Sequence, residues 1–130
     1  MPDAEPQAMA PKRRILVVDD DPHSTMIIRE TLELDYDVNC VSSGEACLDE
    51  VNAFAPDLIL LDMMMPGMSG ADVCKRLRND AQTKGVPVIF VSSLEVHYLQ
   101  LFAGQANVEG ALHKPIDVNE LLHKVHAHLN

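Results

Sequence analysis

The chain has 130 residues, the length of a single domain, and 47% of them are hydrophobic, which suffices for one buried core. Its formal net charge is −10, which argues against direct binding of nucleic acid or of anionic membranes by this chain. No apolar run approaches the roughly 20 residues that span a bilayer, and no secretory signal pattern is evident at the N-terminus. We therefore expect a cytoplasmic protein that meets protein partners.

The first twelve residues differ in composition from the rest of the chain. They carry Pro2, Pro6 and Pro11 among small and polar residues, which predicts a disordered tail over residues 1–12. The remaining residues, 13–130, are predicted to form one domain. The three cysteines, at positions 40, 47 and 74, have no metal-binding spacing and are interpreted as reduced thiols.

Hydrophobic patterning predicts strands that alternate with helices along the whole domain. Strands are predicted over residues 14–18, 36–41, 58–61, 88–91 and 109–113. Helices are predicted over residues 21–33, 43–55, 71–79 and 95–103, and from Asp117 to the end, with Asp21 and Asp117 as the N-caps of the first and last helix. Five such alternations predict an α/β fold of the (βα)5 doubly wound type, with a five-stranded parallel sheet and helices on both of its faces.

Reactive side chains occur where the predicted strands end. The first strand runs into Asp19 and Asp20, the third into Asp62, the fourth into Ser92, and the fifth into Lys114. In an open parallel sheet, ligands bind beyond the carboxyl ends of the strands, so we expect these side chains to converge on one edge. Carboxylates crowded with a lysine and a hydroxyl predict a site for a divalent cation and a phosphoryl group.

Four segments that include these residues resemble a known family. Residues 15–22, residues 57–70, residues 87–93 and the pair Lys114-Pro115 occur in the order and spacing found in the receiver domain of two-component response regulators, the CheY-like domains. The resemblance covers residues 12–129 and implies a flavodoxin-like strand order of 2-1-3-4-5. It also implies a phosphorylation-dependent signalling domain that is not an enzyme and that catalyses only its own phosphorylation and dephosphorylation.

The resemblance assigns a metal site to the acidic residues. Asp19, Asp20 and Asp62 match the carboxylates that bind Mg²⁺, with Asp20 expected as a direct ligand, and the backbone carbonyl of Met64 matches a further ligand. The chemistry agrees with this assignment, because Mg²⁺ is a hard cation that favours carboxylate, carbonyl and water oxygens. Without the ion, the three carboxylates should repel one another and raise at least one pKa.

The resemblance also assigns the groups that handle the phosphoryl group. Asp62 matches the phosphate-accepting aspartate, Ser92 the hydroxyl that turns toward the phosphoryl group, and Lys114 the lysine that pairs with it. A Lys114–Pro115 bond in the cis form is implied as well. The donor implied is a histidine kinase or a histidine phosphotransfer protein.

Two positions depart from the family pattern. Three residues before the lysine, where receivers usually carry an aromatic switch residue, this chain has Ala111. We hypothesise that Tyr98 or Phe102 contributes to signalling in its place. Two residues after Asp62 stands Met64 instead of a polar residue that could orient water, which predicts slower or differently tuned loss of the phosphoryl group.

The residues at two places along the chain disfavour a phosphohydrolase and a flavin-binding module. A haloacid dehalogenase-type phosphohydrolase needs a second acid at the position of Met64, and a flavin site needs a phosphate loop where this chain has three aspartates. His123, His126 and His128 are interpreted as a solvent-facing helix end, not as a metal site.

A degenerate receiver that serves only for docking or dimerisation remains an alternative. A downstream effector or an appended output domain, and a phosphorylation-linked dimer, are the further partners considered.

Overall fold

The computed structural model describes residues 11–129 of the chain. The predicted tail therefore lies almost wholly outside the described residues. Ten elements alternate without interruption. The strands are β1 (Arg14–Val18), β2 (Asp37–Val41), β3 (Leu58–Asp62), β4 (Val88–Ser92) and β5 (Gly110–His113). The helices are α2 (Pro22–Leu32), α3 (Gly44–Phe54), α4 (Gly70–Arg78), α5 (Val96–Ala106) and α6 (Val118–Leu129).

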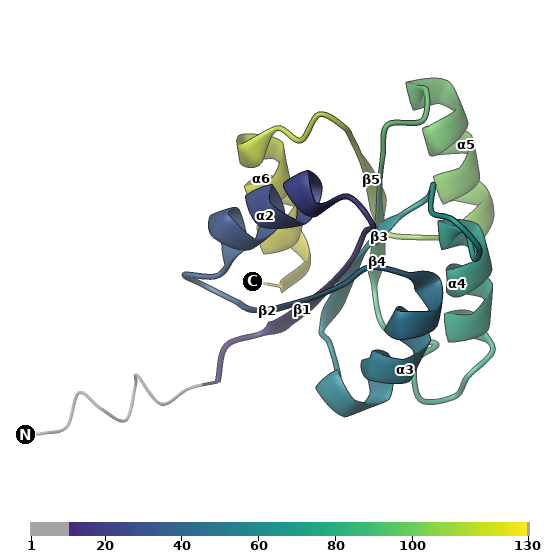
Figure 1. The fold of residues 1–130 in the computed structure, drawn as a ribbon, viewed down its shortest axis with the longest axis horizontal. Coiled ribbons are helices and arrows are strands. Elements are labelled where there is room, and N and C mark those ends of the chain that lie inside the picture. Colours follow the sequence, from purple (N-terminus) through teal and green to yellow (C-terminus); the bar gives the residue numbers. More distant parts are fainter. Residues whose placement is uncertain (1–10, 130) are drawn as a thin grey trace, which may run out of the picture.

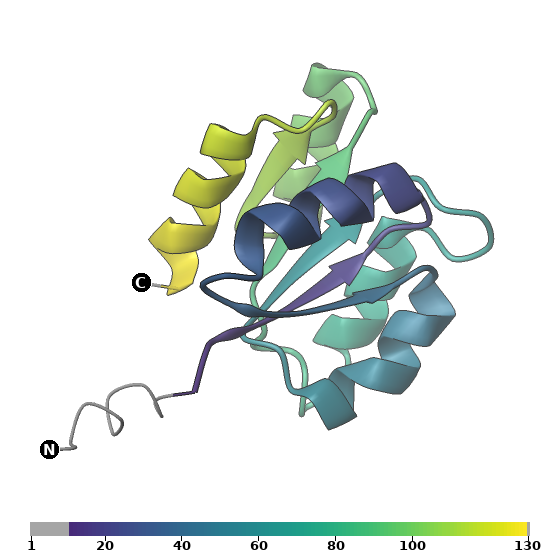
Figure 2. The same cartoon turned by 60° about the vertical axis from the view of Figure 1, so that its left-hand side comes forward.

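The strands form one parallel sheet in the order β2-β1-β3-β4-β5, which confirms the predicted fold class and strand order. Helices α2 and α6 cover one face of the sheet, and α3, α4 and α5 cover the other (Figure 1; Figure 2). The order reverses beside β1, because the chain moves from β1 outward to β2 and then returns to β3 on the other side. This reversal is where an open α/β sheet leaves a crevice for a ligand.

Alternation along the strands divides the core into two halves. Ile15 and Val17 of β1 pack toward α2 and α6, whereas Leu16 and Val18 pack toward α3, α4 and α5. All five residues of β3 are buried, as are all five of β4. These strands therefore need apolar side chains on both faces, which explains their unbroken apolar sequences. Among residues 11–129, no helix combines the length and hydrophobicity needed to cross a bilayer.

The helix starts follow local capping chemistry. Asp21 accepts a hydrogen bond from the backbone N–H of His23 and precedes a proline at the first helical position of α2. Asp117 accepts hydrogen bonds from Asn119 and Glu120 at the start of α6. Both caps were predicted from the sequence, and each fixes the direction in which the chain leaves the edge of the sheet.

The extent of α5 differs from the sequence prediction. The helix continues to Ala106 instead of stopping near residue 103, with Gly104 inside it. It ends where Asn107 adopts a left-handed conformation, φ 56°, and returns its backbone N–H to the carbonyls of Ala103 and Gly104. Asparagine is one of the few residues that enters this conformation readily. The helix therefore continues through Gly104 and is capped at Asn107.

Candidate metal and phosphoryl site

The carboxyl ends of β1 and β3 bring three carboxylates together. Asp19 directly follows β1, Asp20 is the next residue, and Asp62 is the last residue of β3. One carboxylate oxygen of each lies within 4.8 Å of the others. Asp19 and Asp62 are buried, at 2% and 4% exposure, while Asp20 is exposed to solvent. The structure thus brings together the acidic residues that were predicted as metal ligands.

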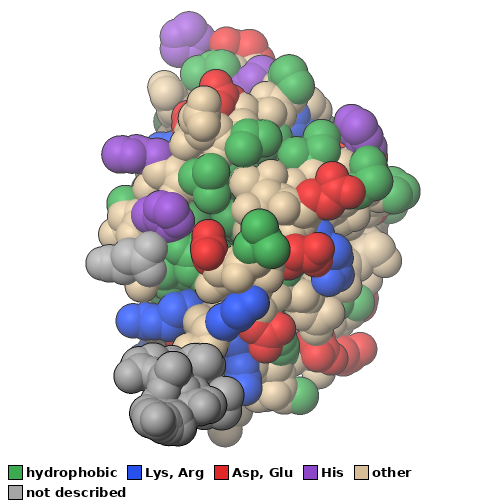
Figure 3. Space-filling view, turned by 90° about the vertical axis from the view of Figure 1, so that its left-hand side faces the viewer, with side chains coloured by type: hydrophobic (Ala, Val, Ile, Leu, Met, Phe, Trp, Pro, Cys, Tyr) green, Lys and Arg blue, Asp and Glu red, His purple; other side chains and the backbone are tan. Residues whose placement is uncertain are grey.

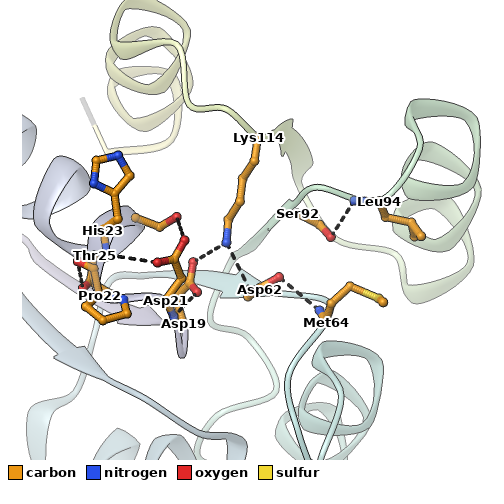
Figure 4. A network of polar contacts seen from close by, with 11 residues as sticks. Asp19, Asp21, Pro22, His23, Thr25, Asp62, Met64, Ser92, Leu94 and Lys114 are labelled. Atoms are coloured by element: carbon orange, nitrogen blue, oxygen red, sulfur yellow. Dashed lines mark hydrogen bonds and ion pairs between the residues drawn. The ribbon is translucent and has the colours of Figure 1, made fainter.

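Lys114 reaches this group from the end of β5 (Figure 4). Its Nζ lies 2.9 Å from Asp19 Oδ2 and 3.3 Å from Asp62 Oδ2. The lysine is followed by a cis peptide bond to Pro115, as predicted. Burial alone would lower the pKa of Lys114, but Asp19 and Asp62 together raise it above its ordinary value. The lysine therefore remains a cation between two carboxylates.

Asp62 carries a strongly perturbed carboxyl group. Burial is the main cause that raises its pKa to about 6, and the charge of Asp19 contributes to the rise. The backbone N–H of Met64 donates to Asp62 Oδ1 at 3.0 Å and, with Lys114, opposes that rise. One oxygen of Asp62 is thus held by the loop after β3, and the other faces the lysine.

One oxygen of Asp19 stands out. Asp19 Oδ1 accepts from the backbone N–H of Asp21 at 2.9 Å, which fixes the side chain. Asp19 Oδ2 is buried and makes no hydrogen bond of acceptable geometry, so its close contact with Lys114 is an ion pair without a well-directed hydrogen bond. A buried carboxylate oxygen in this state has unused capacity to bind a cation.

Ser92 is the last residue of β4 and is fully buried, at 0% exposure. Its Oγ accepts from the backbone N–H of Leu94 at 3.1 Å, and Figure 4 shows the side chain turned toward that residue. Ser93, the next residue, is exposed and lines the cavity that opens above Asp62. In this arrangement Ser92 is not among the residues that line the cavity, whereas its neighbour Ser93 is.

The cavity has a volume of about 540 Å³ and a second wall that the sequence analysis did not assign. His23 and Ile27, one turn apart on α2, line it together with Ile116. The signal available in the sequence was their spacing of four residues, close after Asp20, which places both on one face of the helix. The site therefore continues from the carboxylates into a mixed polar and apolar groove.

The histidines of α6 and the three cysteines lie outside the group of carboxylates at this edge. Within residues 11–129, the three aspartates form the one group of at least three His, Cys, Asp or Glu side chains that could hold a metal ion. The histidines of α6 belong to no such group among the described residues. All three cysteines are free, and burial raises the pKa of the Cys47 thiol to about 12, which leaves it unreactive.

Ala111 lies in β5 opposite Phe90 and is half-buried against the core half that includes α5. The departure from the family pattern is therefore at a strand position beside that helix. On α5, Tyr98 is 58% exposed and Phe102 is 36% exposed. Neither aromatic belongs to the fully buried core.

Comparison with known proteins agrees with this geometry. Residues 15–126 match the model of the response regulator receiver domain. The chain is 34% identical over 119 residues to the DNA-binding response regulator MtrA of Mycolicibacterium smegmatis, covering 91% of this chain and 51% of the relative. It is 36% identical over 115 residues to the DNA-binding dual master transcriptional regulator RpaA of Synechocystis, covering 88% and 48%. The chain thus spans about half the length of these curated relatives.

Solved structures give the same result. A crystal structure described as that of a response regulator from Chloroflexus aurantiacus superposes with a TM-score of 0.84 at 28% identity, covering 91% of this chain and 98% of that one. The family match extends over the sheet, the acidic edge and Lys114 together. The chain belongs to the response regulator receiver domain family.

Proposed function

We propose that this chain accepts a phosphoryl group on Asp62, from a phosphohistidine of a histidine kinase or a histidine phosphotransfer protein, and thereby changes its affinity for a protein partner. The observation that carries the proposal is the buried Asp62 carboxylate, held within reach of Asp19, Asp20 and the Lys114 ammonium. Three carboxylates against one lysine leave the edge with excess negative charge, which a divalent cation would balance.

The donor set fits Mg²⁺. The carboxylates of Asp19, Asp20 and Asp62 are hard oxygen ligands, and Asp19 Oδ2 has unused capacity. We propose the backbone carbonyl of Met64 as a further ligand. When bound, the ion supplies positive charge that offsets the repulsion between a carboxylate and an incoming phosphoryl group.

The transfer itself is a displacement at phosphorus. An oxygen of Asp62 forms the new P–O bond as the P–N bond to the donor imidazole breaks, and the imidazole nitrogen leaves with the bonding electrons and takes up a proton. Lys114, already between two carboxylates, is placed to hold a negative phosphoryl oxygen. Ser92 would turn its hydroxyl from Leu94 toward the same group. The product is an acyl phosphate, a covalent intermediate that stores a signal.

The wider organisation follows from the relatives. Because they are about twice as long, we propose that this domain, residues 13–130, works with a downstream effector or an appended output domain. The net charge of −10 makes direct nucleic-acid binding by this domain itself unfavourable. We propose the cytoplasm as its compartment, where kinase and effector would be accessible.

The test is the intact mass of the chain after incubation with Mg²⁺ and acetyl phosphate. We expect one added phosphoryl group in the wild type, none in Asp62→Asn, and none when EDTA removes the metal. Asp49→Asn, an exposed carboxylate on α3, is the matched control and should be modified like the wild type. Modification that persists in Asp62→Asn would place the acceptor elsewhere and overturn the proposal.

Metal binding is measured separately from phosphorylation. Mg²⁺ that binds the folded state should raise the thermal midpoint in proportion to the logarithm of its concentration. The rise should shrink in Asp20→Asn and persist in Asp49→Asn. An equal rise in both variants would show that the ion binds outside the acidic edge.

Ala111 favours a second candidate, a receiver that serves only as a docking or dimerisation module. Such a chain would add no phosphoryl group under the conditions above and would not respond to beryllofluoride, a mimic of the phosphoryl group. Beryllofluoride binding without detectable phosphorylation would instead indicate a short-lived acyl phosphate.

A further inference from the structure

A groove of about 430 Å³ lies between α4 and α5, apart from the acidic site. These two helices stand side by side on the face of the sheet opposite α2 and α6 (Figure 1). The apolar part of the lining comes from Ala71, Cys74, Phe102 and Ala106, and two cations, Lys75 and Arg78, lie among them. The groove shares no lining residue with the cavity above Asp62.

Helix α5 exposes unusually apolar surface. Its eleven residues include no Asp, Glu, Lys or Arg, and Leu99 is its one fully buried side chain. Tyr98 and Leu101 are more than half exposed, and Phe102 is 36% exposed. A helix that is apolar around most of its circumference is normally covered on more than one side. Within residues 11–129, α4, β4 and β5 make its main contacts.

The cations of the groove differ in their partners. Arg78 donates to the carbonyls of Lys84 and Val86 and faces Glu109 at 3.9 Å, so it is held in place. The backbone carbonyl of Lys75 accepts from the N–H of Asn79, but its ammonium group makes no ion pair or hydrogen bond with any residue in 11–129. Basic residues near a helix C-terminus are common and do not by themselves make a site. Here, however, Lys75 borders the exposed apolar surface of a second helix, on a chain whose net charge is −10.

The apolar surface and the lysine of the groove together indicate which kind of partner segment would bind there. Apolar surface beside an unpaired lysine suits a segment that presents apolar side chains with a carboxylate next to them. A second copy of the chain with the same groove facing it is disfavoured, because two-fold symmetry would bring Lys75 and Arg78 of both copies into one interface. The opposite face offers no comparable surface, because Figure 3 shows its apolar side chains interrupted by acidic side chains and histidines.

We propose that the groove between α4 and α5 is a docking site for an acidic amphipathic helix of a partner protein. Apolar side chains of that helix would lie against Phe102 and Ala106, and a carboxylate would pair with Lys75. This is helix-in-groove recognition, in which spaced apolar anchors enter a preformed hydrophobic groove. The proposal does not depend on phosphorylation of Asp62.

The test uses the unphosphorylated full chain, labelled with ¹⁵N, and a synthetic amphipathic helix with Leu on one face and Glu beside it. We expect amide shifts centred on residues 71–79 and 98–106. The same peptide with Lys in place of Glu should not bind. No binding of the acidic peptide at millimolar concentration, or shifts centred on another surface, would overturn the proposal.

Matched substitutions separate the groove from general charge attraction. Lys75→Glu should weaken binding roughly fivefold, as expected for reversing one exposed ion pair. Arg76→Glu, an exposed neighbour outside the groove, makes the same charge change and should have a much smaller effect. Equal losses in both variants would mean that the peptide responds only to net charge.

The apolar contact is tested in the same way. Phe102→Ala should weaken binding roughly tenfold, because aromatic anchors carry much of the energy of such contacts. Leu101→Ala removes a more exposed apolar side chain that does not line the groove and should leave binding nearly unchanged. The reverse order of effects would place the docking surface on another side of α5.

Discussion

The amino and carboxyl ends of the sheet differ in how their charged side chains are paired. At the amino ends of the strands, charged side chains have complementary partners: Asp57 accepts from the backbone N–H of Arg14 at 2.8 Å, and Glu109 accepts from that of Val88 at 2.8 Å while facing Arg78. At the carboxyl ends, three carboxylates share one lysine, and a buried oxygen of Asp19 has no hydrogen bond. The amino end of the sheet is thus arranged for stability and the carboxyl end for chemistry.

The difference has a physical cause. Asp57 and Glu109 keep part of their contact with water, whereas Asp19 and Asp62 are buried and lie close to one another, so that burial and mutual repulsion both disfavour their charged forms. A protein retains such repulsion when a ligand relieves it. The pKa of Asp62 is raised first by burial and then by the charge of Asp19.

The largest effect on stability is expected where backbone packs against the site. A Cβ at Gly70 would overlap the carbonyl oxygen of Asp62 and lie 2.8 Å from Met63 Cα. Gly70→Ala should therefore destabilise the fold by about 2–3 kcal/mol in urea denaturation. Gly104→Ala, with nothing within 4 Å of the new Cβ, should instead stabilise α5 by about 0.5–1 kcal/mol. Equal effects in the two variants would contradict the packing argument.

Removing a hydrogen-bond acceptor at the amino end of the sheet should lower the free energy of unfolding slightly less. Glu109→Ala leaves the backbone N–H of the buried Val88 without its acceptor, and we expect a loss of about 1–3 kcal/mol. Glu109→Gln keeps an acceptor oxygen and should recover part of that loss. Glu30→Ala removes an exposed carboxylate on α2 and serves as the control. If the control lost as much stability as Glu109→Ala, the complementary pairing at this end would have no special value.

At the carboxyl end, removing a charge should have the opposite sign. Burial and Asp19 raise the pKa of Asp62 to about 6 in the folded state, above its ordinary value of 3.8. Charging Asp62 therefore costs folding free energy as the pH rises from about 4 to 6, and the cost is complete above that range. Without Mg²⁺, Asp62→Asn should be more stable than the wild type by about 1–2 kcal/mol at pH 8.

The same variant should lose its advantage below pH 4, where Asp62 is protonated in both the folded and the unfolded state. Urea denaturation of both proteins in EDTA between pH 4 and pH 8 measures this. A stability difference that does not change with pH would show that the folded state does not raise the pKa of Asp62.

The smallest effect on stability is expected at Met64, whose side chain is 58% exposed while its backbone N–H holds Asp62. Met64→Asn keeps that backbone contact and adds an amide able to orient water near the proposed acyl phosphate. We expect an unchanged unfolding free energy and a lifetime of the phosphorylated form that is several times shorter. Met26→Asn, at an exposed methionine on α2, is the control. An unchanged lifetime in Met64→Asn would remove Met64 from the control of dephosphorylation.

The sequence determined the order of the elements, the parallel sheet and the residues at its carboxyl edge. Hydrophobic periodicity is a local property, and parallel strands place their ends on one edge, so Asp19, Asp62 and Lys114 could be brought together by argument alone. The capping roles of Asp21 and Asp117 were predictable for the same reason, since each acts within three residues of its own position.

The tertiary structure alone decided what depends on distances between segments far apart in the chain. It placed Lys114 between Asp19 and Asp62, left one buried oxygen of Asp19 without a hydrogen bond, and brought His23 and Ile116 into the lining of one cavity. It also extended α5 through Gly104 and left a groove between that helix and α4. Local pattern records which face of an element is apolar, whereas the packing of the whole chain fixes how much of that face is covered and which charges must share one space.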